Sequence, residues 1–426
     1  MPKFSALVVL CMLACPACGG RIEQDSATAP ASDDAPAGSV APSTKLATVA
    51  CSQLGDRDPT ATSGSVLWLQ KFGAPAISSV AITPDGGAFL ARAAGLLKID
   101  RDGNLLWSKP FGKLVATDSA GDAYVAGTFT DTLALGDTEL HAGGGSEAFL
   151  AKLDPSGNLL FGTLLGPADP QLSSLAVAAD GSAVVSGSGL GTVELDAQGA
   201  LLWSKRFFGH VALDASGNVF MTGTLREPTD FGAGPLSSAG GGDIFLVKLR
   251  ANGELVFSRQ FGDAGAQQQG QGIFVDRANR VIVSGVFDGT VDFGAGALSL
   301  DRTACPSEAW CETAGFVTKF DPDGNALWSW SAGPMRALAG VATDSRDNIV
   351  LSGASPGGVT PFRIPLLSAL SADGSELWRR AEWPKTGIGS GQDVVVDPCD
   401  NVLWSVSVLE SIGSDEEQPY IAKLLP

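Results

Sequence analysis

An internal repeat limits the folds that this chain can adopt. One short pattern recurs along it, an apolar run containing Lys followed by a Gly-containing turn such as Asp-Pro-Ser-Gly-Asn. The pattern occupies residues 148–158, 244–254, 315–325 and, in truncated form, 420–426. Asp and Pro at the start of such a turn, with Gly at its left-handed position, are typical of a hairpin between short strands. The repeat therefore predicts a fold built from one supersecondary unit used many times.

A second hairpin opens each repeat, so each unit is predicted to contribute four antiparallel strands. The units begin near Ile77, Lys113, Leu172, His210, Gln271, Leu338 and Asp393. This count predicts seven blades. The tryptophans of the fourth strands are predicted to pack between blades, and they are Trp68, Trp107, Trp203, Trp328 and Trp378.

The two ends of the repeat region complement each other. The seventh unit stops at Pro426 after its third strand, and residues 66–73 match residues 105–112, which form the fourth strand of the first unit. The chain is therefore predicted to be all-β, a seven-bladed β-propeller of four-stranded antiparallel blades, with the N-terminal strand completing the last blade. An open β-solenoid is the alternative, and it would not need one end of the chain to complete the other.

The pattern Phe-[Leu/Val]-[Ala/Val/Thr]-Lys-[Leu/Phe]-Asp-Pro-x-Gly-Asn resembles the β-propeller repeat of bacterial surface proteins and lipoproteins, the seven-bladed SBBP type. This resemblance covers residues 66–426. It implies a propeller outside the cytoplasm and no catalytic residues. Residues 195–203 and 370–378 are similar to quinoprotein-type repeats, which place Trp four residues after Gly and usually form eight blades.

Members of the quinoprotein-type family differ in whether they hold a cofactor. Some bind pyrroloquinoline quinone and have a vicinal Cys pair, and others are empty scaffolds in outer-membrane assembly. This chain has no adjacent cysteines and seven units. The resemblance therefore implies the scaffold version, and no cofactor is expected.

The first 64 residues are predicted to direct and anchor the protein. Lys3 precedes an apolar run at residues 4–13, which is too short to span a bilayer and is typical of a secretory signal. Cys15 follows Leu-Ala as in a bacterial lipobox. Residues 1–14 are therefore predicted to be a signal peptide and Cys15 the lipidated residue. Cys18 is the second choice, and an ordinary signal peptide with incidental cysteines is the alternative.

The remaining boundaries follow from composition. Residues 15–64 are rich in Ala, Pro, Ser, Thr and Asp and cannot bury enough apolar surface to fold, so they are predicted to be a disordered, lipid-anchored tether. Residues 65–426 are predicted to be the propeller. The expected location is the bacterial cell envelope, at the outer membrane, on its periplasmic or its surface side.

The charge balance excludes several partners. With 28 basic and 46 acidic residues the net charge is −18. A nucleic acid is not expected, because polyanions bind basic surfaces. Membrane contact is expected through the lipid anchor only. The sequence has two histidines, His141 and His210, so neither a metal site nor a His-dependent catalytic network is expected. We expect a monomer without enzymatic activity.

The other cysteines predict disulfides, which persist in exported proteins. A bond between Cys305 and Cys311 would close a short loop and hold Trp310 in place, with zinc binding as the weaker alternative. Cys51 and Cys399 are predicted to form a second bond. Cys399 lies in the first turn of the seventh unit, and the tether carrying Cys51 enters the last blade on the same face, within reach of an extended chain.

The predicted function is to bind an envelope protein or a glycan. Long connections between strands, which in a propeller surround the channel on one face, are the expected ligand face. The candidate residues on them are Gln267, Gln271, Arg302, Glu308 and Trp310. A scaffold subunit of an outer-membrane assembly is one alternative. A glycan-active enzyme is another, and it requires ionisable residues facing the channel, for which Lys113, His210 and Asp393 are the candidates.

Overall fold

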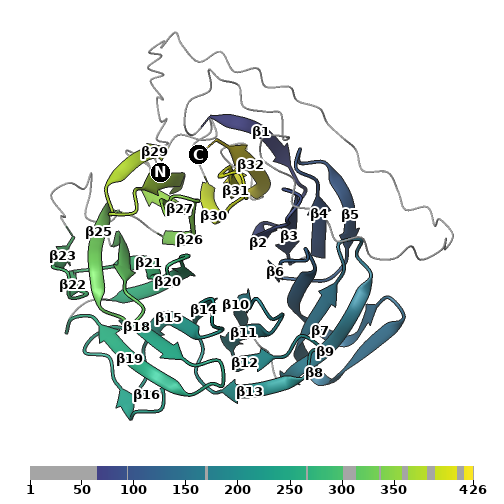
Figure 1. Cartoon of the computed structure of the whole chain (residues 1–426), viewed down its shortest axis with the longest axis horizontal. Helices are drawn as coiled ribbons and strands as arrows, with labels where there is room; N and C mark the ends of the chain where they lie inside the picture. Colours follow the sequence, from purple (N-terminus) through teal and green to yellow (C-terminus); the bar gives the residue numbers. More distant parts are fainter. Residues whose placement is uncertain are drawn as a thin grey trace, which may run out of the picture. The chain divides into compact units, whose positions relative to one another are not determined.

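The computed structural model of the protein describes residues 65–93, 95–167, 171–264, 267–300, 313–334, 337–356, 363–380, 389–409 and 417–425. These residues contain no helix and form a ring of seven four-stranded antiparallel sheets, as the repeat predicts (Figure 1). No helix that could cross a membrane occurs within these ranges. In each blade the first strand, A, lies innermost and the fourth strand, D, lies at the outer rim.

The strands of each blade follow one another along the chain in the order A to D. Blades 1 to 3 consist of β2 (Ile77–Ile82), β3 (Ala88–Arg92), β4 (Gly95–Ile99) and β5 (Leu105–Lys109); β6 (Leu114–Thr117), β7 (Ala123–Leu135), β8 (Thr138–Leu153) and β9 (Leu159–Pro167); and β10 (Gln171–Val177), β11 (Ala183–Ser188), β12 (Gly191–Leu195) and β13 (Leu201–Lys205). Blades 4 and 5 consist of β14 (His210–Leu213), β15 (Val219–Leu225), β18 (Asp243–Leu249) and β19 (Leu255–Phe261); and β20 (Gln268–Val275), β21 (Val281–Phe287), β24 (Ala314–Phe320) and β25 (Ala326–Pro334). Blade 6 consists of β26 (Ala337–Thr343), β27 (Ile349–Pro356), β28 (Arg363–Leu370) and β29 (Glu376–Arg380).

Blade 7 joins the two ends of the described chain. Its strands are β30 (Gly389–Val396), β31 (Val402–Leu409), β32 (Glu417–Leu424) and, as strand D, β1 (Val66–Lys71). β1 pairs with β32 in an antiparallel register that places Trp68 opposite Lys423. This confirms that the N-terminal strand completes the last blade, which closes the ring without leaving an unpaired edge inside it.

The hairpin turns are built as the repeat predicts. In blade 2, the Asp154 carboxylate accepts hydrogen bonds from the backbone N–H groups of Ser156 and Asn158, and Gly157 adopts φ +86°. Such a turn needs a residue with positive φ, which Gly supplies without steric cost. Asn279, Asp347 and Asp400 take the equivalent position between strands A and B of blades 5 to 7, with φ values of 58°, 62° and 68°.

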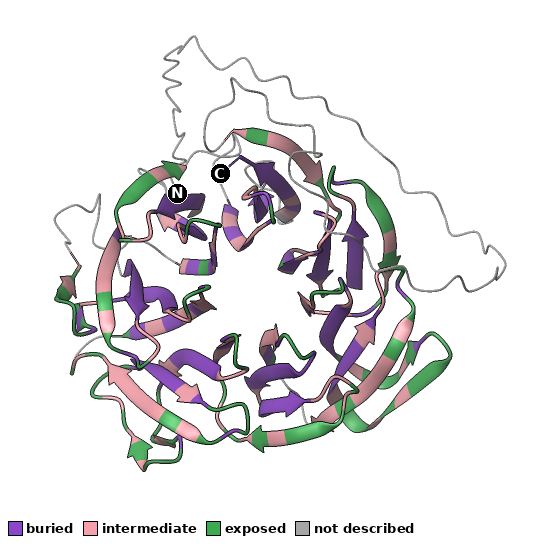
Figure 2. Ribbon diagram, viewed as in Figure 1, coloured by how far each residue is buried: buried purple, intermediate pink, exposed green. Residues whose placement is uncertain are grey.

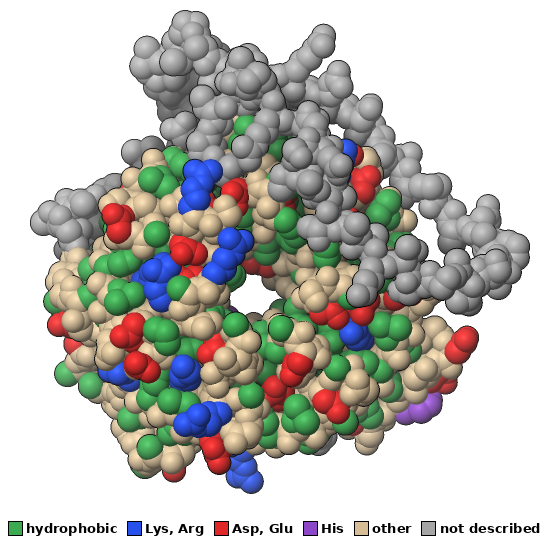
Figure 3. Space-filling view, in the orientation of Figure 1, with side chains coloured by type: hydrophobic (Ala, Val, Ile, Leu, Met, Phe, Trp, Pro, Cys, Tyr) green, Lys and Arg blue, Asp and Glu red, His purple; other side chains and the backbone are tan. Residues whose placement is uncertain are grey.

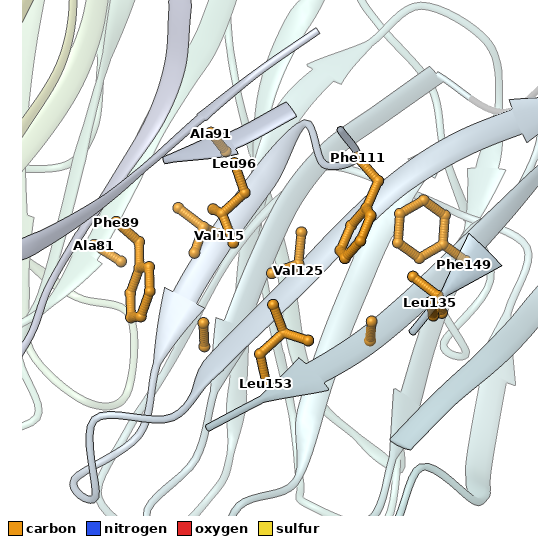
Figure 4. Close-up of a cluster of buried hydrophobic side chains, with 12 residues drawn as sticks. Ala81, Phe89, Ala91, Leu96, Phe111, Val115, Val125, Leu135, Phe149 and Leu153 are labelled. Atoms are coloured by element: carbon orange, nitrogen blue, oxygen red, sulfur yellow. The ribbon is translucent and has the colours of Figure 1, made fainter. Parts of the chain in front are cut away.

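The core lies between blades rather than inside one. Strands B and C are mostly buried, apart from the outer extension of β7 and β8, whereas strands D are half-buried to exposed (Figure 2). One apolar cluster joins Phe89 and Leu96 of blade 1 to Val125 and Phe149 of blade 2 (Figure 4). Because every blade buries both faces against its neighbours, burial of apolar area holds the ring together.

Aromatic side chains on strands D connect each blade to the next. The Trp107 Nε1–H donates to the Pro155 carbonyl oxygen at 3.3 Å, and the ring lies against Gly157 in the turn between strands C and D of blade 2. Trp68, Trp203 and Trp328 donate in the same way to the next blade, at 3.1, 3.0 and 3.2 Å. The predicted packing of these four tryptophans between blades is confirmed.

Three connections between strands B and C differ from their expected form. The connection at residues 131–146, one of the long connections expected around the channel, is a continuation of β7 and β8. Two further connections contain the hairpins β16–β17 (Thr229–Asp230, Pro235–Leu236) and β22–β23 (Thr290–Asp292, Ala297–Ser299). These hairpins lie at the outer rim rather than around the channel (Figure 1). The physical reason is that Phe231 and Phe293, each 4% exposed, pack against Phe245 and Phe316.

Candidate binding site at the channel mouth

The seven strands A surround an open central channel (Figures 1 and 3). Hydroxyl, amide and ammonium side chains gather where these strands begin, on the side of the connections from strand D to strand A. We call these residues the collar, and they are Ser78, Lys113, Ser173, Gln271 and Gln392. The opposite ends of the strands are mostly apolar, with Ile82, Val275 and Val396 as the last residues of their strands. The turns between strands A and B that follow these ends carry charged residues, among them Asp344 and Asp397, so both mouths of the channel carry polar groups.

Several collar side chains also join neighbouring blades. Ser78 Oγ donates to the Lys113 carbonyl oxygen at 2.7 Å, and Ser173 Oγ donates to that of Gly209 at 3.2 Å. Gln271 Oε1 accepts the backbone N–H of Leu338 at 3.1 Å, whereas its Nε2 is 3.5 Å from Gln269 Oε1. The side-chain oxygen of Gln271 is thus held by a hydrogen bond, whereas its amide N–H groups make only one long contact. The collar is therefore a rigid surface whose donors can still form hydrogen bonds with a ligand.

Gln267 lies next to the collar but not in it. Its side chain is exposed, and its carbonyl oxygen accepts the backbone N–H of Asp288 at 3.0 Å. Of the predicted ligand-face residues, Gln267 and Gln271 are therefore brought to the same side of blade 5. The predicted site residues outside the described ranges are Cys15, Cys18, Cys51, Arg302, Cys305, Glu308, Trp310 and Cys311.

Two acidic residues that sequence reasoning missed hold the connections near this face. Asp243 is fully buried and accepts hydrogen bonds from Ser238 Oγ at 3.0 Å and Gln260 Nε2 at 2.5 Å. Glu147 accepts the backbone N–H of Gly143 at 2.8 Å. Both residues directly precede the repeated strand-C pattern, so their common position was a signal available in the sequence.

Two ionisable residues line the next layer of the channel wall. Burial lowers the pKa of His210, and burial raises the pKa of Asp393 to about 6, although backbone N–H groups of Val80 and Val394 donate to its carboxylate and act in the opposite direction. The second histidine, His141, is remote from them in sequence and structure, because it lies in the outer extension of β7 and β8 with its Nδ1 3.1 Å from Thr132 Oγ1. Within the described ranges, no three His, Cys, Asp or Glu residues group closely enough to hold a metal ion.

A shallow cavity of about 260 Å³ lies at the other mouth, among the turns between strands A and B. It is lined by Ile82, Arg277, Thr343, Asp344, Ser345, Val396, Asp397, Pro398 and Asp400. Asp400 accepts both the backbone N–H and the Oγ–H of Ser345, at 2.7 and 2.6 Å. Arg277 donates to the Ser345 carbonyl oxygen at 3.3 Å. These hydrogen bonds connect blades 5, 6 and 7. The polar groups of the cavity therefore serve mainly to hold neighbouring blades together.

Cys399 lies in the same turn as Pro398 and is 8% exposed. It is disulfide-bonded, and the chain's other six cysteines lie outside the described ranges. Its pairing with Cys51 therefore stays a prediction.

Comparisons with known proteins place the fold but not a family. No protein-family model matches the chain. Uncharacterized WD repeat-containing protein L264 of Acanthamoeba polyphaga mimivirus is 26% identical over 203 residues, and the match covers 38% of this chain and 14% of that protein. The structure of U3-55K has a TM-score of 0.54 and 11% identity, over 85% of this chain and 100% of that one. BamB from Moraxella catarrhalis has a TM-score of 0.42 and 14% identity, over 82% of this chain and 85% of its own. At these identities the chain is placed by its fold alone, and that fold is a seven-bladed β-propeller.

Proposed function

We propose that this protein is an exported, lipid-anchored, non-enzymatic β-propeller that binds a protein or glycan partner in the bacterial cell envelope through the collar. The observation that carries the proposal is the collar itself, a group of hydroxyl, amide and ammonium side chains where the strands A begin, at one mouth of the channel. These side chains stand on strands that are packed on both sides, so binding needs little ordering of the protein.

The sequence supports the cellular part of the proposal. The resemblance of the strand-C pattern to the SBBP-type repeat of bacterial lipoproteins points to the envelope, and Cys15 in its lipobox-like context is the proposed anchor. The Trp-containing pattern at residues 195–203 and 370–378 favours a second candidate, a cofactor-free scaffold subunit of an outer-membrane assembly. The two candidates share the collar and differ in whether the partner is held permanently.

Site-specific photo-crosslinking in cells tests the binding surface. A photoreactive amino acid at Gln392, in the collar, is expected to capture a discrete partner. The matched control is Leu377, which is 53% exposed on the outer strand β29. A permanent assembly subunit should be captured in near-equal amount to the protein, whereas a transient partner should be captured in part.

A glycan ligand would produce no protein crosslink at Gln392. In that case binding of the purified protein to envelope glycans should fall when Gln271 and Gln392 are replaced by Ala and persist when Leu377 is replaced by Ala. Equal capture at Gln392 and Leu377, or no collar-dependent binding in either experiment, would contradict the proposal.

The anchor and the closing disulfide are tested separately. Cys15→Ala is expected to abolish incorporation of labelled fatty acid and move the protein from the membrane to the soluble fraction, and Cys18→Ala is the control.

Peptide mapping without reductant is expected to recover the peptides of Cys51 and Cys399 as one species. Alkylation of Cys51 without prior reduction would exclude that pairing.

A further inference from the structure

The seams between neighbouring strands A use a hydroxyl group in two of the blades. We call the residue that follows each collar position on the strand the seam residue. Ser79 is the seam residue of blade 1, and its Oγ both accepts the backbone N–H of Val115 at 3.3 Å and donates to the Val115 carbonyl oxygen at 3.2 Å. Ser174 makes the same pair of bonds with Val211 in blade 4, at 3.0 and 3.4 Å. A hydroxyl can make both bonds because it is a donor and an acceptor.

A carboxyl group takes this position at the seam where the ring closes. Asp393 is the seam residue of blade 7, and its Oδ2 accepts the backbone N–H of Val80 in blade 1 at 2.8 Å. Its Oδ1 accepts the N–H of Val394 at 2.8 Å. An ionised carboxylate has no proton to donate, so it can make only the accepting half of the serine bond pair. Once protonated on Oδ2, it can also donate to the Val80 carbonyl oxygen.

The surroundings of Asp393 supply little compensation for its charge. The strands that pack most extensively against β30 are β2, β26, β27, β28 and β31. These five strands carry one charged residue, Arg363, which is the first residue of β28. Lys113 of the collar lies beyond β2, at the start of blade 2. His210 belongs to blade 4, on another seam. Among the described residues no cation pairs with Asp393, and burial without such a partner favours the neutral carboxyl, in agreement with its raised pKa of about 6.

We propose that Asp393 is a proton-dependent latch at the closing seam of the propeller. The carboxylate takes a proton from solvent, and the neutral carboxyl that results makes both bonds to Val80, as serine does between blades 1 and 2 and between blades 3 and 4. Ionisation removes the donated bond and leaves a buried charge, so the seam is tighter in mildly acidic than in neutral surroundings. This seam joins blade 1 to the blade that contains both ends of the repeat region, β1 and β32. The latch does not depend on the proposed binding function.

Hydrogen exchange of the full chain tests the latch. Exchange of the segment containing Val80, corrected for intrinsic chemistry, is compared at about pH 5 and about pH 7.5, on either side of the expected transition. Protection in the wild type is expected to fall several-fold at the higher pH. Asp393→Ser is expected to abolish this difference, because its hydroxyl makes both bonds at either pH. The Val211 segment at the serine seam is the internal control.

The reciprocal variant shows whether the carboxyl alone is sufficient. Ser174→Asp is expected to introduce the same pH-dependent loss of protection at Val211 and to leave Val80 unchanged. A carboxyl resonance for Asp393 that titrates near 6 in an NMR experiment would identify the group directly. The proposal is overturned if Asp393→Ser keeps the wild-type pH dependence at Val80, or if Asp393 titrates with the ordinary pKa of an aspartate.

Discussion

Blades 5 and 3 share the same four strands but carry opposite charge at one buried position. In blade 5, Lys319 on β24 reaches Asp276 at the start of the turn between strands A and B, with Nζ and Oδ2 3.0 Å apart and side-chain exposures of 1% and 0%. The corresponding residues of blade 3 are Glu194 on β12 and Ala178. Glu194 is 2% exposed, and its Oε2 has no hydrogen-bond partner in the described structure. Burial raises its pKa.

The lysine of blade 5 belongs to the repeat. The same position is occupied in blades 1, 2, 4 and 7 by Lys98, Lys152, Lys248 and Lys423, each paired with Asp in the turn between strands A and B. In blade 6 the aspartate remains as Asp344 but Ala369 replaces the lysine. All these blades keep the same strand order. The ion pair is therefore a local stabilising feature, whereas the ring depends on the apolar surfaces of strands B and C.

Removing the lysine of blade 5 should have the largest effect. Lys319→Met is expected to lower the free energy of unfolding by about 3 kcal/mol, because breaking a buried pair leaves an uncompensated charge. The loss should be at the lower end of the range for broken buried ion pairs, because Arg280 Nε, 2.7 Å from Asp276 Oδ2, still compensates part of the aspartate charge. Urea unfolding of the full chain measures it. Arg206→Met removes an exposed cation and should change the same quantity by less than about 0.5 kcal/mol. Equal losses in the two variants would show that the pair contributes nothing.

Replacing Glu194 of blade 3 by a neutral residue should raise the free energy of unfolding, and the size of the gain should depend on pH. The folded pKa of Glu194 lies above its unfolded value, so the stabilisation from its protonated form is present at low pH and is lost as the pH rises through the folded pKa. Glu194→Gln is expected to raise the free energy of unfolding by about 1–2 kcal/mol at pH 8, because it removes a buried charge without a full set of partners. Near pH 4 the variant and the wild type should be alike. A gain that is the same at both pH values would exclude ionisation of Glu194 as the cause.

Blades 3 and 5 share one contact with the next blade, the hydrogen bond donated by the tryptophan of strand D. Trp203→Phe keeps the ring over Gly253 but removes the bond from Nε1 to the Ala251 carbonyl oxygen, so a loss of about 1 kcal/mol in the free energy of unfolding is expected. Phe161 occupies the equivalent position in blade 2, over Gly199, which shows that phenylalanine fits there. Trp378→Phe is the control, because blade 7 has no continuous turn between strands C and D to accept the bond. If both variants lose the same amount, the hydrogen bond is not the cause.

The smallest effect is expected at the turn of blade 5. Asn279 accepts the backbone N–H of Ala215 in blade 4 through its Oδ1 at 3.2 Å, while its φ of 58° is strained for a residue other than Gly. Blade 3 has Gly181 at this position. Asn279→Gly should leave the free energy of unfolding within about 0.5 kcal/mol, because relief of strain offsets the lost bond. Asn279→Ala loses the bond and keeps the strain, and thermal unfolding should show it to be less stable than either.

The candidate site was only partly predictable from sequence. Gln271 was placed near the channel because it begins a strand A, but Ser78, Ser173 and Gln392 were not recognised. The reason is that bulges shift the register inside several of these strands, for example between Gly270 and Gly272 in β20. One extra residue reverses which face of a strand each side chain occupies, and local patterns do not reveal where it lies.

The strands of the blades, their turns, the number of blades and the closure of the ring could be predicted from the sequence alone, because hairpin chemistry is local and recurs in every unit. Which side chains meet across blades depends on the three-dimensional packing. Asp393 meets Val80 across 313 positions of sequence, and Phe231 and Phe293 carry their hairpins to the outer rim by packing on the buried strands. Such contacts depend on how neighbouring blades stack, and no single repeat contains that information.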